Sequence, residues 1–218
     1  MYEVAKIPYL SSLIHTRFTK GNDFMDGNYL LYLCFSYLLG NIMTGYFVVK
    51  TLGNKDIREQ GSGSVGARNA GRVHGKPAFI FTFLGDALKG VLVILLASYL
   101  HFSDEMALLG LTMAILGHIK PVMLGFKGGK GISTFIGGMI IFEPIMIPVI
   151  IMSFLLLYIL LKSFTFAGLT AFLLFPITLF YQDYSVLSCL LAIGMIAMLY
   201  LAHTENIMER LKKIERKS

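Results

Sequence analysis

Long apolar runs are the feature that most constrains how this chain can fold. Hydrophobic residues make up 56% of the 218-residue sequence, 15% of residues are charged, and the mean hydropathy is +0.69. A helix that crosses a bilayer needs about 20 mainly apolar residues, and several runs approach or exceed that length. They cover about residues 28–49, 77–100, 106–124, 132–161, 164–181 and 184–202. The sequence therefore predicts an all-α polytopic membrane protein.

The run at 132–161 is longer than one comfortable span, because ordinary transmembrane helices have about 17–25 residues. It contains Glu143-Pro144 and then Pro148. Proline breaks helices, and a carboxylate is costly in lipid. We therefore predict a short helix at Ile132–Phe142 and a second helix at about 145–161, which gives about seven transmembrane helices.

Charged residues between these runs support the seven-helix arrangement. Basic residues gather on one side, at Lys50, Lys55, Arg58, Arg68, Arg72, Lys76, Lys120, Lys127, Lys130, Lys162, Arg210, Lys212, Lys213, Arg216 and Lys217. The opposite turns hold Asp104, Glu105, Glu143 and Asp183, without Lys or Arg. The positive-inside rule makes the basic side cytoplasmic, with the N-terminus outside and the C-terminus inside. Because the net charge of +6 comes from these membrane-flanking clusters, we expect no nucleic-acid partner.

The first 27 residues are an exception to this charge pattern. They carry Lys6, Arg17 and Lys20 although the arrangement places them outside. We hypothesise that translation starts at Met25, which the intact mass of the native protein tests, since a mass that includes residues 1–24 would exclude it. Residues 1–27 are thus an extension, and residues 28–202 form one membrane domain.

Residues 203–218 form a basic tail after the last apolar run. Ile207, Leu211 and Ile214 alternate there with basic residues. This pattern is typical of a cytoplasmic helix that lies on an anionic lipid surface. Both cysteines, Cys34 and Cys189, lie inside apolar runs, so we interpret them as small hydrophobic residues.

The first of two polar, glycine-rich segments is Gly61-Ser62-Gly63-Ser64-Val65-Gly66-Ala67-Arg68-Asn69, followed by Arg72. Its glycine spacing matches the dinucleotide fingerprint, but that fingerprint needs a βαβ unit, and a membrane helix and a polar linker precede it here. A flexible loop is the alternative. Glycines allow N–H groups to surround an anion, and Arg grips phosphate through two bonds. We predict phosphate or substrate binding by Ser62, Gly63, Ser64, Asn69 and Arg72, with Arg68 in support.

The second segment is Gly125-Phe126-Lys127-Gly128-Gly129-Lys130-Gly131. It is not a Walker A motif, because Lys130 is followed by Gly131 instead of Ser or Thr. The segment can still bind phosphate by the same physical means as a Walker A loop, because glycine N–H groups, a lysine and the positive end of a following helix all attract an anion. We predict phosphate binding by Lys127, Gly128, Gly129, Lys130 and Gly131 in a re-entrant or interfacial cytoplasmic loop. A tight turn that only follows the positive-inside rule is the alternative.

Four ionisable residues lie inside or at the ends of the spans. Asp86 and Lys89 are three residues apart on one helix face, either as a structural ion pair or in direct contact with substrate. His118 and His203 end their spans on the phosphate-binding side, and Asn206 lies one turn after His203. Histidine is the commonest general base near neutral pH, although an interfacial histidine is often only an anchor.

The order and spacing of four segments resemble the bacterial acyl-phosphate:glycerol-3-phosphate acyltransferase family (PlsY type), from about residue 28 to the end. The segments are Gly61-Ser62-Gly63-x-x-Gly66-Ala67-x-Asn69-x-x-Arg72, Asp86-x-x-Lys89-Gly90, Gly117-His118-x-x-Pro121 with Phe126-Lys127-Gly128-Gly129-Lys130-Gly131, and His203-x-x-Asn206. The resemblance implies seven spans and a cytoplasmic active site in a bacterial cell membrane. It also implies acyl transfer from a fatty acyl phosphate to the 1-hydroxyl of sn-glycerol 3-phosphate, giving lysophosphatidate and phosphate as the first step of phospholipid synthesis.

Site residues follow from the resemblance by position. It implies that Ser62, Arg72, Lys130, His203 and Asn206 hold glycerol phosphate and the reacting groups, without metal or cofactor, in a protein expected to be monomeric. The chain departs from the family at Ser64, commonly Asn, at Arg68, commonly Thr, and at Thr204, often Arg. Two alternatives stay open: a divergent transferase that acylates another polyol phosphate, and a membrane binder or transporter of a phosphorylated metabolite.

Overall fold

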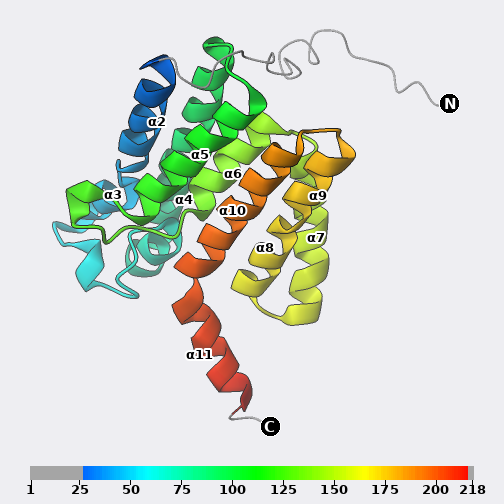
Figure 1. Ribbon diagram of the computed structural model, residues 1–218. Helices are drawn as coiled ribbons and strands as arrows, with labels where there is room; N and C mark the ends of the chain where they lie inside the picture. Colours follow the sequence, from blue (N-terminus) through cyan, green and yellow to red (C-terminus); the bar gives the residue numbers. More distant parts are fainter. Residues whose placement is uncertain (1–26, 216–218) are drawn as a thin grey trace.

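The structure, a computed structural model, describes residues 27–215 as a bundle of helices, without strands in that range (Figure 1). The predictions on residues 1–26, including a start at Met25, and on the last three residues lie outside the described part. The α-helices are α2 (Gly27–Gly40), α3 (Thr44–Gly53), α4 (Ala67–Tyr99), α5 (Asp104–Ile119), α6 (Ile132–Phe142), α7 (Met146–Leu161), α8 (Phe164–Phe172), α9 (Leu174–Tyr181), α10 (Val186–Ala202) and α11 (Thr204–Glu215). Short 3-10 helices lie at Ile57–Glu59 and Val122–Leu124.

Four segments are long and apolar enough to cross a membrane, namely Gly27–Gly53, Ala67–Tyr99, Asp104–Leu124 and Phe164–Tyr181. Three shorter apolar helices, α6, α7 and α10, lie between and after them. The predicted break near Glu143 is confirmed, because α6 ends at Phe142 and α7 begins at Met146. Glu143 is 3% exposed and accepts a hydrogen bond of 2.9 Å from the Tyr184 hydroxyl. The carboxylate therefore has a protein partner in place of lipid.

The first apolar run is not one helix, as its composition suggested, but two. The chain breaks between α2 and α3 at residues 41–43. Asn41 occupies the break: its side-chain amide donates to the Tyr37 carbonyl at 2.6 Å, and its Oδ1 accepts from the Val122 N–H at 2.6 Å. Lys89 binds the carbonyls of Gly40 and Ile42 at 3.3 and 2.8 Å. The break is thus stabilised by polar groups from distant parts of the chain.

The second span begins earlier than its apolar run, at Ala67 instead of residue 77. Gly75 has a non-helical conformation, with φ of 81°, and Pro77 follows it, so α4 is kinked between its polar first turns and its apolar body. Arg68, Asn69 and Arg72 therefore lie on the first turns of a helix and not in the loop where the sequence placed them. The run at 164–181 also breaks, into α8 and α9, where Pro176 cannot donate to the Phe172 carbonyl.

Glycines bring the central helices close together. A side chain on Gly90 of α4 would collide with the Thr134 backbone of α6, and one on Gly137 of α6 would collide with the Ala87 backbone of α4. Small residues at such contacts are the usual means of helix packing in membranes. By contrast, α7 buries only Met146 and lies at the side of the bundle with α8 and α9 (Figure 1). The helix α11 extends from the end of α10 (Figure 1).

Candidate active site

The loop before α4, residues 61–66, is held from behind by one buried side chain. Asn69 is 2% exposed, and its Oδ1 accepts from the Ser62 N–H at 2.8 Å. Its amide nitrogen donates to the carbonyls of Gln60 and Ser64, both at 2.9 Å. Gly61 and Gly63 have φ of 60° and 72°, a backbone conformation that glycine adopts without strain. Asn69 therefore fixes the shape of the loop, and the glycines allow the turn.

The second loop, residues 125–131, rests on His118. The Gly129 N–H donates to the His118 carbonyl at 3.0 Å, and the His118 ring lies directly against the Gly129 Cα. Gly131, with φ of 81°, precedes α6, and no side chain caps that helix. The first N–H groups of a helix are unsatisfied and attract anions. The segment thus leads into the uncapped start of α6, and phosphate binding there stays a prediction.

Two contacts tie these loops to each other and to the tail. The Val65 N–H meets the Gly128 carbonyl at 3.5 Å, which joins the two loops. The Lys130 ammonium donates to the Asn206 side-chain oxygen, which joins the second loop to the first turn of α11. Asn206 therefore orients the lysine charge, although 76 residues separate the two in sequence.

His203 lies at the junction of α10 and α11 and is 8% exposed. Its Nδ1 is 2.8 Å from the Leu199 carbonyl, which can only accept, so Nδ1 carries a hydrogen and Nε2 carries the lone pair of the neutral ring. Burial lowers the pKa of His203, the Leu199 hydrogen bond opposes this, and the charges of Lys130 and Arg68 lower it again. Near pH 7 the ring is therefore neutral and able to accept a proton.

A cavity of about 1540 Å³ brings these groups together. Its polar part is lined by Ser62, Gly63, Ser64, Arg68, Asn69, Arg72, His118, Lys127, Gly128, Gly129, Lys130, Gly131, His203 and Asn206. Its apolar part is lined by Phe79, Phe83, Ile136, Ile150, Phe154, Phe164, Leu169, Phe172 and Met198. Every candidate residue from the sequence lines this cavity except Asp86 and Lys89. The site thus joins a cationic end to an apolar wall.

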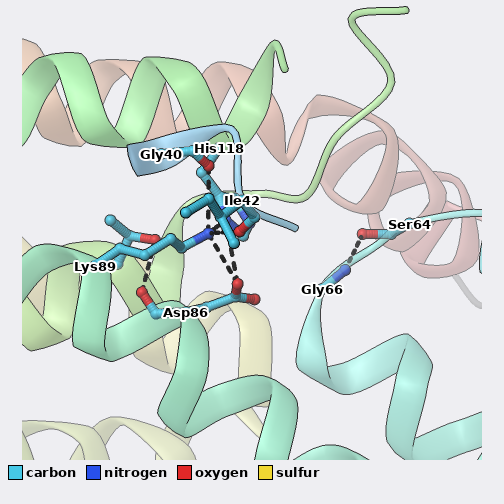
Figure 2. Close-up of polar contacts among 8 residues, drawn as sticks. Gly40, Ile42, Ser64, Gly66, Asp86, Lys89 and His118 are labelled. Atoms are coloured by element: carbon cyan, nitrogen blue, oxygen red, sulfur yellow. Dashed lines mark hydrogen bonds and ion pairs between the residues drawn. The ribbon is translucent and has the colours of Figure 1, made fainter. Parts of the chain in front are cut away.

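Asp86 and Lys89 form a buried cluster with His118 behind the second loop (Figure 2). Lys89 Nζ lies 2.9 Å from an Asp86 carboxylate oxygen and 2.9 Å from His118 Nδ1. A charged lysine has only donors, so His118 Nδ1 accepts, and its Nε2 side faces Gly129. The pair therefore acts on the cavity through the His118 ring.

Sequence analysis missed one interaction across the cavity. Arg68 Nη1 donates to the Thr165 hydroxyl at 2.8 Å, and its guanidinium carbon lies 5.5 Å from the centre of the Phe164 ring. Thr165 lies on the first turn of α8, within an apolar run, and nothing in its local sequence predicts a contact with Arg68. Asn41 was also missed, although a Gly-Asn pair inside an apolar run is a signal that the helix breaks there.

Fold and site together define a helical membrane protein with a cavity that joins cations and glycine-rich loops to an apolar wall, as expected for an enzyme of lipid metabolism. The comparisons are specific: the family model for glycerol-3-phosphate acyltransferase matches residues 30–213, and the chain belongs to that family.

Relatives and solved structures agree with the family. Glycerol-3-phosphate acyltransferase 1 of Bacillus anthracis is 44% identical over 84% of this chain and 98% of its own length. The protein of the same name from Desulfitobacterium hafniense is 42% identical over 82% of this chain and 88% of its length. The crystal structure of PlsY (YgiH), an integral membrane glycerol 3-phosphate acyltransferase, in its glycerol 3-phosphate form has a TM-score of 0.78 and 31% identity, covering 86% of this chain and 94% of that one. Its lysophosphatidic acid form has a TM-score of 0.77 and 30% identity.

Proposed function

We propose that this protein transfers a fatty acyl group from acyl phosphate to the 1-hydroxyl of sn-glycerol 3-phosphate, giving 1-acyl-sn-glycerol 3-phosphate and inorganic phosphate. The observation that carries the proposal is the single cavity that joins two glycine-rich loops, Lys130, His203 and Asn206 to an apolar wall. Both substrates carry phosphate, and the donor carries a long apolar chain. The names of the relatives and the two ligand forms of PlsY support the acceptor and the product.

The chemistry needs no covalent intermediate with the protein, because acyl phosphate is an activated mixed anhydride. The hydroxyl oxygen attacks the acyl carbon, a carbon–oxygen ester bond forms, and the carbon–oxygen bond to phosphate breaks with its electron pair on the phosphate. His203 Nε2 takes the hydroxyl proton, since Nδ1 is engaged with Leu199. Lys130, oriented by Asn206, offsets the negative charge that develops on oxygen.

Binding then divides between the two loops. The loop at residues 61–66, with Ser62, Ser64 and Arg72, holds the acceptor phosphate. The backbone of the second loop and the start of α6 hold an anion beside Lys130. Holding two substrates in reacting geometry supplies much of the rate enhancement in such a transfer. No step requires a metal or a cofactor.

The arrangement in the membrane follows from the charges. We propose seven spans, with the first formed by α2 and α3 together and the sixth by α8 and α9, the N-terminus outside and the C-terminus inside. The basic residues of the 50–76 loop, of the second loop and of the tail support this orientation, which puts the active site at the cytoplasmic face of a bacterial cell membrane. The catalytic domain is then residues 28–202, the tail is 203–218, and a monomer suffices because one chain supplies the whole cavity.

Radiolabelled acyl phosphate and glycerol 3-phosphate, supplied to purified protein in the presence of a chelator, test the proposal through formation of lysophosphatidate. We expect Lys130→Ala and His203→Ala to abolish turnover while the protein keeps its elution volume in detergent. Lys55→Ala, an exposed lysine outside the cavity, is the matched control. Turnover of Lys130→Ala at the wild-type rate contradicts the site assignment. A panel of polyol phosphates identifies a different acceptor, and uptake without product indicates a transporter.

A further inference from the structure

Arg68 is a cation that reaches across the cavity to neutral partners. It begins on the first turn of α4 and contacts the start of α8, where it donates to the Thr165 hydroxyl at 2.8 Å and lies over the Phe164 ring. Among the residues whose side chains the structure describes, it forms no salt bridge, whereas Arg58 pairs with Asp56 at 2.6 Å. Its charge is therefore held in place without being neutralised.

A phosphate competes well for such a side chain. The guanidinium group binds phosphate through two parallel charge-assisted hydrogen bonds, which are about twice as strong as bonds between neutral groups. The bond to Thr165 has a neutral acceptor, and a cation over an exposed ring adds only a modest attraction. Arg68 is exposed, so its side chain is able to turn from Thr165 toward a ligand in the cavity. The contact with Thr165 thus describes a resting partner.

The position of Arg68 identifies the phosphate it meets. Phe164 and Thr165 belong to the α7–α8 side of the cavity, which is lined by Ile150, Phe154 and Phe164. An acyl chain has to lie along an apolar wall, so its phosphate lies where that wall meets the cations. Glycerol 3-phosphate is polar throughout and gains nothing from this wall. Arg68 is therefore placed at the border where the head of a lipid-like donor ends.

We propose that Arg68 binds the phosphate of the acyl donor and exchanges Thr165 for it when the donor enters the cavity. The proposal rests on the proposed acyl transfer and adds a donor-specific residue to it. This phosphate becomes the leaving group and gains negative charge as the carbon–oxygen bond breaks, so the same guanidinium favours its departure. Inorganic phosphate, the product, is expected to bind at the same place.

Steady-state kinetics of three variants separates the donor from the acceptor. We expect Arg68→Ala to raise the KM for acyl phosphate about tenfold or more, the loss expected for one charge-assisted hydrogen bond, and to change the KM for glycerol 3-phosphate less than about twofold. Arg68→Lys keeps the charge but lacks the planar guanidinium group, so we expect its KM for acyl phosphate to lie between those of the wild type and Arg68→Ala. Inorganic phosphate is expected to inhibit the wild type competitively with acyl phosphate, and its inhibition constant to rise with Arg68→Ala.

Thr165→Val is the matched variant, because it removes the resting partner and leaves the guanidinium in place. We expect a KM for acyl phosphate that is unchanged or lower. An equal loss in Thr165→Val and Arg68→Ala overturns the proposal, since the bridge itself is then what matters. An unchanged KM for the donor in Arg68→Ala, a rise confined to the acceptor, or non-competitive inhibition of the wild type by phosphate also overturns it. Wild-type protein that forms no lysophosphatidate refutes the acyl transfer instead, so the two failures are distinct.

Discussion

Replacement of Gly129 by alanine tests whether activity depends on the exact position of the second loop. A Cβ on Gly129 would lie 2.9 Å from His118 Cδ2 and 3.0 Å from Cε1, and closer still to Nε2, against 3.4–4 Å for ordinary contact. The ring cannot give way easily, because His118 is 2% exposed and its Nδ1 is held by Lys89 at 2.9 Å. The loop has to move instead, by roughly 1 Å.

A displacement of this size is costly for a reaction that depends on positioning, since a misplacement of about 1 Å reduces rates by about 100-fold. We therefore expect Gly129→Ala to lower kcat/KM for lysophosphatidate formation by about two orders of magnitude, with normal expression and elution in detergent. Gly194→Ala is the control, because a Cβ at Gly194 meets no atom within 4 Å. A kcat/KM for Gly129→Ala within threefold of the wild type would refute the reasoning.

Three further predictions concern the supports of the site. Lys89→Met leaves the Asp86 carboxylate buried without its cation, so we expect thermal unfolding to show a loss of about 3–5 kcal/mol in stability. The double variant Asp86→Asn/Lys89→Met should largely restore it. Equal melting temperatures of Lys89→Met and wild type contradict this. Asn69→Ala removes four hydrogen bonds to loop backbone, each contributing about 0.5–1.5 kcal/mol, and we expect the KM for glycerol 3-phosphate to rise about tenfold or more; an unchanged KM shows that the loop keeps its shape alone. Arg68 lowers the pKa of His203, so removing its charge raises that pKa, and the acidic limb of the kcat profile should move to higher pH in Arg68→Ala; a shift to lower pH excludes His203 as the titrating base.

The helices could be predicted from local sequence, but the breaks within them could not all be. The break at Glu143 is visible because a carboxylate and two prolines interrupt an apolar run. The break at residues 41–43 depends on Lys89, which supplies the bond to the Ile42 carbonyl from 47 residues away. Hydropathy shows that a segment is apolar, but it does not show which distant group satisfies a freed carbonyl.

The candidate site, too, could be predicted only in part from local sequence. The glycines and cations of both loops could be found from composition, because phosphate binding requires bare backbone and positive charge within a few residues. The roles of Asn69 and His118 as supports of the two loops could not be found in this way. Both residue types also bind ligands, and only the fold shows that these two side chains face loop backbone. Arg68 and Thr165 are 97 residues apart, so their contact has no local signal.

The site is therefore built in two layers that respond differently to substitution. Asn69 and the Asp86–Lys89–His118 cluster fix the two loops from the protein interior, where all four side chains are buried. Lys130 and Arg68 act from the cavity side, and Arg68 is exposed to solvent. A buried unpaired group costs stability, whereas an exposed cation is solvated when its partner is lost. Substitutions behind the loops should thus lower stability and activity together, and loss of a cavity-facing cation should lower activity alone.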